Sequence, residues 1–124
     1  MLLPTEWMSN LVLSLQEEEQ LNEILSNENS DHYVFIFKHS TRCIVSSKAF
    51  KALIPDWEKE GKIPLYILDL LSYRSLSNEV SRQLKVVHES PQLLLINKGK
   101  CLNSVSHWRV NAETAFEMLG EVQS

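Results

Sequence analysis

One cysteine of the chain occupies a position that suits a nucleophilic thiol. Cys43 follows a short polar turn and opens a segment whose apolar residues recur at helical spacing. Unpaired backbone N–H groups and the helix dipole favour negative charge at the start of a helix, and a thiolate is such a charge. Nearby cations lower the pKa of a cysteine there, and Arg42, Lys38 and Lys48 are close in sequence. We interpret Cys43 as a reactive thiol, although a lone cysteine can also be a small buried hydrophobe.

The motif that begins at Cys43 contains a single thiol. Cys43-Ile44-Val45-Ser46 has serine where a dithiol redox motif has its second cysteine. The Ser46 hydroxyl could donate a hydrogen bond to a thiolate one turn earlier, but it cannot form a disulfide with it. A redox cycle at Cys43 would therefore run through a mixed disulfide with another molecule.

The second cysteine, Cys101, is expected to lie far from Cys43. It follows a predicted hairpin turn at residues 97–100, at the end of a strand that starts just after Pro91. A strand of five residues places the two thiols on the order of 15 Å apart. A disulfide requires a Cα separation of roughly 4.4–6.8 Å. We predict that Cys101 is structural.

Two histidines could serve the thiol or the fold. His39 lies four residues before Cys43, where it could accept the thiol proton or cover the core as a loop residue. His107 and Trp108 follow an expected edge strand that returns to the rim of the cysteine pocket, so they either line a substrate groove or seal that edge. No convincing set of metal ligands is present in the sequence, so no metal site is expected.

The composition limits the class of protein. A chain of 124 residues fits a single domain over 1–124, and its net charge of −4 argues against a nucleic-acid partner. Two cysteines give no disulfide framework, which favours a reducing compartment. The first residues lack a basic segment, and the apolar run 11–15 is too short to span a bilayer. We expect a cytoplasmic protein with no membrane partner.

Apolar runs and capping residues predict alternating strands and helices. Strands are expected at 7–13, 33–37, 63–68, 92–96 and 101–105, with turns at 27–31 and 97–100. Helices are expected after a capping box at 14–17, after the capping residues Ser40 and Thr41, after Ser75 or Ser77, and after Asn111. The second helix should kink or restart at Pro55 and end at Gly61.

This order, β-α-β-α-β-α-β-β-α, predicts an α/β fold of the thioredoxin-like class. Such a fold has a central mixed sheet of about 4–5 strands, the last two an antiparallel hairpin, flanked by about 4 helices. A strand, a polar turn and a helix that opens on cysteine are also typical of that fold.

Four short runs resemble one family. They are Phe37-Lys38-His39-Ser40-Thr41-Arg42-Cys43 with Ser46-Ser47, Ser77-Asn78-Glu79, His88-Glu89-Ser90-Pro91-Gln92, and Ser106-His107-Trp108. Together they resemble the monothiol bacilliredoxins, the redox proteins of the bacillithiol system, over nearly the whole chain. Many members have proline after the cysteine, where this chain has Ile44.

The resemblance implies a function and a set of site residues. Cys43 would remove bacillithiol from S-bacillithiolated proteins through a mixed disulfide, with bacillithiol as a transient co-substrate and no tightly bound cofactor. An external thiol or reductase would recycle the protein. The resemblance also implies a cis bond between Ser90 and Pro91. The site would then comprise His39, Ser40, Thr41, Arg42 and Ser46 around the thiol, and Ser90, Pro91, His107 and Trp108 for substrate.

Other functions also fit these residues. The adduct could be another low-molecular-weight thiol such as glutathione, as for a monothiol glutaredoxin. A binding module is a further alternative, either an iron–sulfur carrier or a thioredoxin-fold scaffold without redox work. The carrier is less favoured because Ile44 and Val45 replace the glycine and phenylalanine that such carriers use.

Overall fold

A five-stranded mixed sheet forms the centre of the protein. The computed structural model describes residues 11–26, 32–60 and 63–123. The strands are β1 (Val12–Ser14), β2 (Tyr33–His39), β3 (Leu65–Asp69), β4 (Gln92–Asn97) and β5 (Lys100–Ser106). They are ordered β1-β3-β2-β4-β5, with β1, β3 and β2 parallel and β4 antiparallel to β2 and β5.

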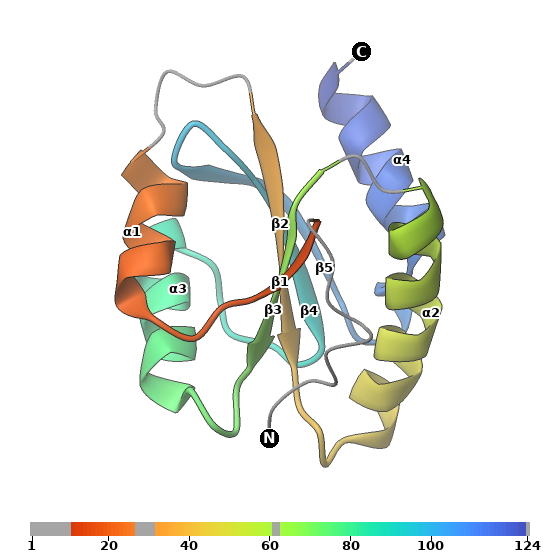
Figure 1. Cartoon of the computed structure of the whole chain (residues 1–124), viewed down its shortest axis with the longest axis horizontal. Coiled ribbons are helices and arrows are strands. Elements are labelled where there is room, and N and C mark those ends of the chain that lie inside the picture. The colour runs from red at the N-terminus through yellow and green to blue at the C-terminus, as the bar shows by residue number, and fades with distance from the viewer. Residues whose placement is uncertain (1–10, 27–31, 61–62, 124) are drawn as a thin grey trace.

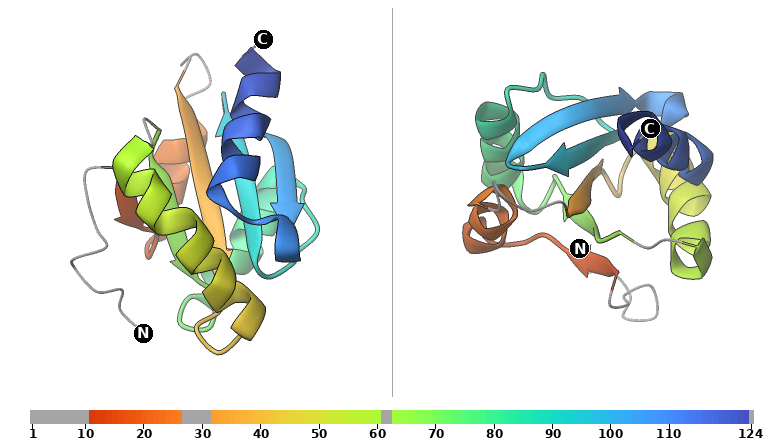
Figure 2. Two further views of the ribbon diagram at one scale, coloured as in Figure 1. Left: turned by 90° about the vertical axis from the view of Figure 1, so that its right-hand side faces the viewer. Right: turned by 90° about the horizontal axis from the view of Figure 1, so that it is seen from above.

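Helices cover both faces of this sheet. They are α1 (Glu18–Ser26), α2 (Ile44–Glu60), α3 (Arg74–Leu84) and α4 (Ala112–Gln123), with a short 3-10 helix η2 (His107–Arg109) between β5 and α4. α1 and α3 lie on one face, and α2 and α4 lie on the other (Figure 1; Figure 2). The predicted fold class, a mixed sheet closed by an antiparallel hairpin and flanked by helices, is confirmed.

The alternation of side chains along β2 explains the two helical layers. Phe35 and Phe37 pack into the core beneath α2 and α4, whereas Ile36 packs beneath α1 and α3. Trp57 of α2 meets Phe35 edge-on with ring centroids 5.1 Å apart, and it stacks on Phe116 of α4 at 5.3 Å. β2 is therefore buried on both faces and gives a fixed support to the residues at its carboxyl end.

The start of the chain differs from the prediction. β1 begins at Val12, and both residues 7–10 of the predicted strand and the predicted turn at 27–31 lie outside the described residues. The predicted capping box is wrong, because Ser14 is the last residue of β1 and pairs with β3. The Gln20 side chain replaces it: its Oε1 atom accepts the N–H groups of Gln16 and Glu17 at 2.8 and 3.0 Å.

Two helix boundaries also differ. α2 runs continuously from Ile44 to Glu60 through Pro55, so of the predicted kink or restart the restart does not occur. The predicted end at Gly61 lies outside the described residues. The proline costs one backbone hydrogen bond, but Leu53 and Trp57 on either side are buried and keep the helix on the sheet.

The cap of the third helix differs from the prediction. Tyr73 is the N-cap of α3, and Ser75 and Ser77 lie inside the helix. Tyr73 takes that position because its N–H bonds to the carbonyl oxygen of Asp69 at 2.9 Å, which closes the turn after β3. Asn111 caps α4 as predicted, since its Oδ1 accepts the Thr114 N–H at 2.8 Å.

The hairpin between β4 and β5 has a two-residue turn. Lys98 and Gly99 have φ values of 54° and 74°, as the tightest antiparallel hairpins require. β5 is an edge strand, as predicted.

Within the described residues, the helices are all too short or too polar to cross a membrane.

Candidate thiol site

Four connections meet at one end of the sheet, those after β2, after β3, before β4 and after β5. The register pairs Lys38 with Gln92 and Gln92 with Ser106, so β2 and β5 end where β4 begins. β3 ends there too, and α2 starts directly beyond β2, at the lower end of the view in Figure 1. The His107 N–H bonds to the Pro91 carbonyl oxygen at 2.9 Å and closes this end. The expected substrate residues Ser90, Pro91, His107 and Trp108 therefore lie at the same pole as Cys43.

Cys43 is the residue that immediately precedes α2. Its carbonyl oxygen accepts the first helical hydrogen bond, from the Ser47 N–H at 2.9 Å, and its own N–H bonds to the Ser40 carbonyl oxygen at 3.2 Å. It therefore occupies the N-cap position rather than the first turn, and Ser40 and Thr41 lie too early to cap the helix. The side chain is half-buried, and the thiol is free.

The Ser46 hydroxyl is turned toward the loop before Cys43. Its Oγ atom accepts the Ser40 N–H at 2.9 Å and lies 2.7 Å from Nδ1 of His39. Among the described residues these are its only hydrogen-bond partners, and both are buried. Ser46 thus fixes the turn that carries the thiol, instead of donating to the sulfur as the sequence suggested.

His39 is the last residue of β2 and not a loop residue. Its ring lies between Phe37 and Phe50, with centroids 5.3 and 5.1 Å away, and the side chain is buried. Burial lowers the pKa of His39, and the nearby Asp69 carboxylate raises it in part. The imidazole is consequently neutral at pH 7. Its Nδ1 atom forms a hydrogen bond with the Ser46 hydroxyl and not with the thiol.

The rim of the site combines cationic and apolar groups. Thr41 and Arg42 lie across a hollow of about 540 Å³ from Leu71 and Ser72, in the turn after β3. The exposed apolar side chains here include Ile44, which is 75% exposed beside the thiol. A substrate that reaches Cys43 therefore meets both polar and apolar surface.

A second hollow lies on the other side of α2. It has a volume of about 170 Å³ and lies between the first turns of α2 and η2. Trp108 is 67% exposed, and the Lys48 ammonium lies 5.6 Å from the centre of its ring. His107 Nε2 lies 3.9 Å from a Glu89 carboxylate oxygen. Most of the Trp108 side chain is therefore accessible and not buried against the edge of the sheet.

The connection before β4 supplies the remaining predicted residues. The bond between Ser90 and Pro91 is cis, as the resemblance implied. Pro91 is buried, and the buried Oγ atom of Ser90 lacks a hydrogen-bond partner within the described part of the chain.

Cys101 lies at the opposite pole. It is paired with Ile96 at the turn end of the hairpin, whereas Pro91 precedes the other end of β4. Its Sγ atom donates to the Asn103 carbonyl oxygen at 3.3 Å, and burial raises the pKa of the thiol. These features agree with the structural role predicted for it.

The comparison with protein families decides the identity of this site. The family described as monothiol bacilliredoxin BrxC matches residues 13–115, which include every site residue named above. The chain belongs to the monothiol bacilliredoxin family. Family and fold together support a redox thiol-exchange protein.

Solved structures add the fold. A thioredoxin-fold protein proposed to be an oxidoreductase is 24% identical, covers 88% of this chain and 94% of its own, and superimposes with a TM-score of 0.76. Thioredoxin from Trypanosoma brucei brucei is 13% identical, covers 90% of both chains and has a TM-score of 0.72. A thioredoxin of Nicotiana alata is 14% identical, covers 89% and 91%, and has a TM-score of 0.71. These likenesses concern the thioredoxin fold alone.

Sequence reasoning missed the role of Lys38. The sequence places it among the cations near the thiol, but its side chain lies on the α3 face of the sheet, away from α2. Nζ donates to the Ser77 carbonyl oxygen at 3.0 Å and to Ser81 Oγ at 2.6 Å, and it lies 3.3 Å from His88 Nδ1. The position of Lys38, directly after the apolar run of β2, could have predicted that the strand continues through it and buries its side chain. Burial lowers the pKa of Lys38 to about 8.

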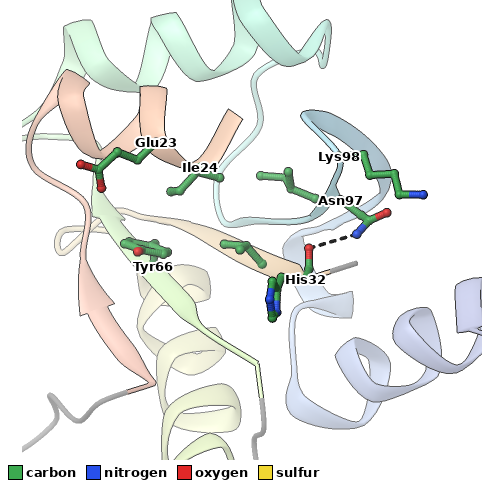
Figure 3. Close-up of a pocket in the computed structure, with 8 residues that line it drawn as sticks. Glu23, Ile24, His32, Tyr66, Asn97 and Lys98 are labelled. Atoms are coloured by element: carbon green, nitrogen blue, oxygen red, sulfur yellow. Dashed lines mark hydrogen bonds between the residues drawn. The ribbon is translucent and has the colours of Figure 1, made fainter. Parts of the chain in front are cut away.

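A further pocket lies away from the thiol. It has a volume of about 190 Å³ and is lined by Glu23 and Ile24 of α1, by Tyr66 of β3, and by residues at the start of β2 and the end of β4. Figure 3 shows these side chains, with the Asn97 amide donating to the His32 carbonyl oxygen at 3.0 Å. The strand ends that form it are opposite those at Cys43, so it takes no part in the thiol chemistry.

Proposed function

We propose that this protein removes bacillithiol from S-bacillithiolated proteins through a mixed disulfide on Cys43. The observation that carries the proposal is the placement of that thiol. Cys43 is half-buried at the start of α2, within a rim formed by the connections after β3, before β4 and after β5. The only other cysteine lies at the opposite pole, so a single thiol must perform the exchange.

The exchange proceeds in two steps. The Cys43 thiolate attacks the bacillithiol sulfur of the substrate's mixed disulfide, and a new S–S bond forms as the old one breaks. The substrate protein leaves as a thiolate and takes up a proton. A second thiol then attacks the adduct, which frees Cys43 and leaves that thiol joined to bacillithiol. The substrate is reduced and the second thiol is oxidised, so the cycle requires an external thiol or reductase.

The local structure supports attack from Cys43 and gives no second group to resolve the adduct. Cys43 immediately precedes the 17-residue helix α2, and its thiol is free and half-buried at this end of the sheet. Ser46 takes the place of a resolving cysteine, and its hydroxyl is engaged with His39 and Ser40. On the rim, Arg42, Lys48 and Trp108 offer charge and a flat apolar surface to the adduct and the polypeptide that carries it.

The test follows the adduct by intact mass. A small test protein that carries one bacillithiol mixed disulfide is mixed with this protein, without other thiols. We expect bacillithiol to leave the test protein and appear on Cys43. Cys43→Ser should abolish the transfer, and Cys101→Ser should leave its rate nearly unchanged. Transfer that persists in Cys43→Ser would refute the proposal.

A parallel reaction distinguishes the adduct. The same test protein is prepared as a glutathione mixed disulfide and treated identically. Slower transfer of glutathione than of bacillithiol supports the proposed specificity. Equal or faster transfer of glutathione would assign the protein to general thiol-adduct exchange, and no transfer of either thiol would favour a binding role.

A further inference from the structure

A buried cation connects three segments that the exchange chemistry leaves unexplained. The Lys38 side chain is fully buried, and its ammonium group meets three acceptors: the Ser77 carbonyl oxygen at 3.0 Å, Ser81 Oγ at 2.6 Å and His88 Nδ1 at 3.3 Å. Two of these belong to α3, and His88 belongs to the connection from α3 to β4. An ammonium group has three N–H donors, so each donor has one acceptor here.

This arrangement is not explained by stability. No carboxylate within the described residues pairs with Lys38. Its partners are a backbone carbonyl oxygen, a hydroxyl and the His88 imidazole. Burial and the nearby cations Lys38 and Arg74 lower the pKa of His88, which disfavours a charge on that ring. A buried charge without an opposite charge is unfavourable, and a well-packed apolar side chain at such a position is often at least as stable. A lysine at this place in β2 therefore points to a task other than holding the fold together.

The neighbour of Lys38 in the sheet acts on the same connection. Gln92 lies directly opposite Lys38 in the register of β2 and β4 and is 2% exposed. Its Nε2 atom donates to the Val87 carbonyl oxygen at 3.0 Å, and its Oε1 atom accepts the Glu89 N–H at 3.4 Å. Lys38 and Gln92 thus hold three consecutive residues, 87–89, from two adjacent points in the sheet. That segment leads directly into the cis bond between Ser90 and Pro91, the two residues of this connection that the proposed function assigns to substrate.

We propose that Lys38 is a positioning residue for the exchange reaction, which acts through His88 to fix segment 87–91 beside Cys43. This inference rests on the proposed function, because it concerns how the substrate meets that thiol. Lys38 does not touch the thiol: it lies on the α3 face, whereas Cys43 begins a helix on the other face. Loss of the contact should loosen one wall of the substrate groove and leave the thiol itself unchanged.

The decisive variants change His88, because its side chain is exposed and its replacement leaves the buried core intact. His88→Leu removes the acceptor of Lys38, whereas His88→Asn keeps one at the position of Nδ1. For bacillithiolated test protein, we expect His88→Leu to raise KM about tenfold, equivalent to about 1.4 kcal/mol and near the lower range for a charge-assisted hydrogen bond. We expect His88→Asn to stay within about twofold of the native protein and kcat to change less than KM in both.

Two further measurements separate positioning from a general effect. Alkylation of Cys43 by iodoacetamide, which needs no substrate groove, should proceed at the native rate in both variants. On a Lys38→Met background, His88→Leu should add no further loss, because the contact is already absent. If the native protein removes adducts, either of two results would overturn the inference. One is an equal KM for His88→Leu and His88→Asn, and the other is additive effects of Lys38→Met and His88→Leu on KM. Failure of the native protein itself would instead refute the proposed function.

Discussion

Replacing Lys38 by methionine should change the pH dependence of folding stability in a defined direction. Burial lowers the pKa of Lys38 to about 8, against 10.5 for an ordinary lysine. The folded protein therefore binds fewer protons than the unfolded chain between these values. Because stability rises with pH wherever the unfolded chain binds more protons, the lysine destabilises the fold below pH 8 and does so less as the pH rises toward 10.5.

The magnitude follows from the same two values. Burial of the charged lysine costs about 3 kcal/mol at about pH 7, and about 2 kcal/mol of this is recovered by about pH 9.5. Methionine carries no charge at any pH, so the variant lacks this change. The free energy of unfolding of the native protein, minus that of Lys38→Met, should therefore increase by about 2 kcal/mol over this interval. The substitution removes only the contribution of Lys38 to the pH dependence of the free energy of unfolding; all other ionisable groups are the same in both proteins.

The measurement is urea unfolding in the presence of a reductant, followed by tryptophan fluorescence, to which Trp57, 1% exposed in the folded protein, contributes. It is repeated at several pH values between about 7 and 9.5 for the native protein and for Lys38→Met. Lys51→Met, at an exposed position of α2, is the matched control and should give a nearly constant difference from the native protein. A difference for Lys38→Met that is also constant, or that falls with pH, would refute the argument from burial.

Three other predictions concern the thiol site. Ser46→Ala should lower the free energy of unfolding by about 1–3 kcal/mol in urea, because it leaves the buried Ser40 N–H and His39 Nδ1 without their partner. Ser46→Cys should expel an adduct from Cys43 without added thiol, whereas the native adduct should persist, as intact mass over time will show. Trp108→Ala should slow adduct removal severalfold yet change the unfolding free energy by less than about 1 kcal/mol, since its side chain is 67% exposed; equal losses of both would contradict a surface role.

The sequence predicted the buried strands of the sheet and its closing hairpin, whereas the order of the strands across the sheet comes from the structure. Continuous apolar runs at 33–37 and 92–96 predicted strands that are buried on both faces, and β2 and β4 contain them. The hairpin turn followed from Asn97 to Lys100, because glycine beside a polar residue suits two positive φ values. These features depend on residues that are adjacent in the sequence, so the pattern of residue types along the chain predicts them.

The end of β2 could not be predicted in the same way. Lys38 and His39 have the composition of a turn, yet both are buried strand residues. The partners that make their burial possible are distant: Ser77, Ser81 and His88 lie 39, 43 and 50 residues from Lys38. Without the packing of α3 on the sheet, a lysine in this place has no acceptors, and the simplest expectation is that the strand has ended.

The same distinction explains the error at the start of α2. Serine and threonine before an apolar segment favour a cap at that point, but the Ser40 N–H is taken by Ser46 Oγ from within the helix. The helix consequently begins three residues later, and Cys43 becomes the residue whose carbonyl oxygen accepts its first hydrogen bond. The serine that replaces a resolving cysteine is therefore also the residue that sets the position of the remaining thiol.

The two final residues of β2 have separate tasks because a strand presents successive side chains to opposite faces. His39 points to the α2 face and, with Ser46, fixes the turn that carries the thiol. Lys38 points to the α3 face and contacts His88, in the connection that leads to the cis bond between Ser90 and Pro91. A register shift of one residue would exchange the faces and place an ammonium group against Phe50. The end of β2 thus supports the turn that carries Cys43 from one face of the sheet and the connection before β4 from the other.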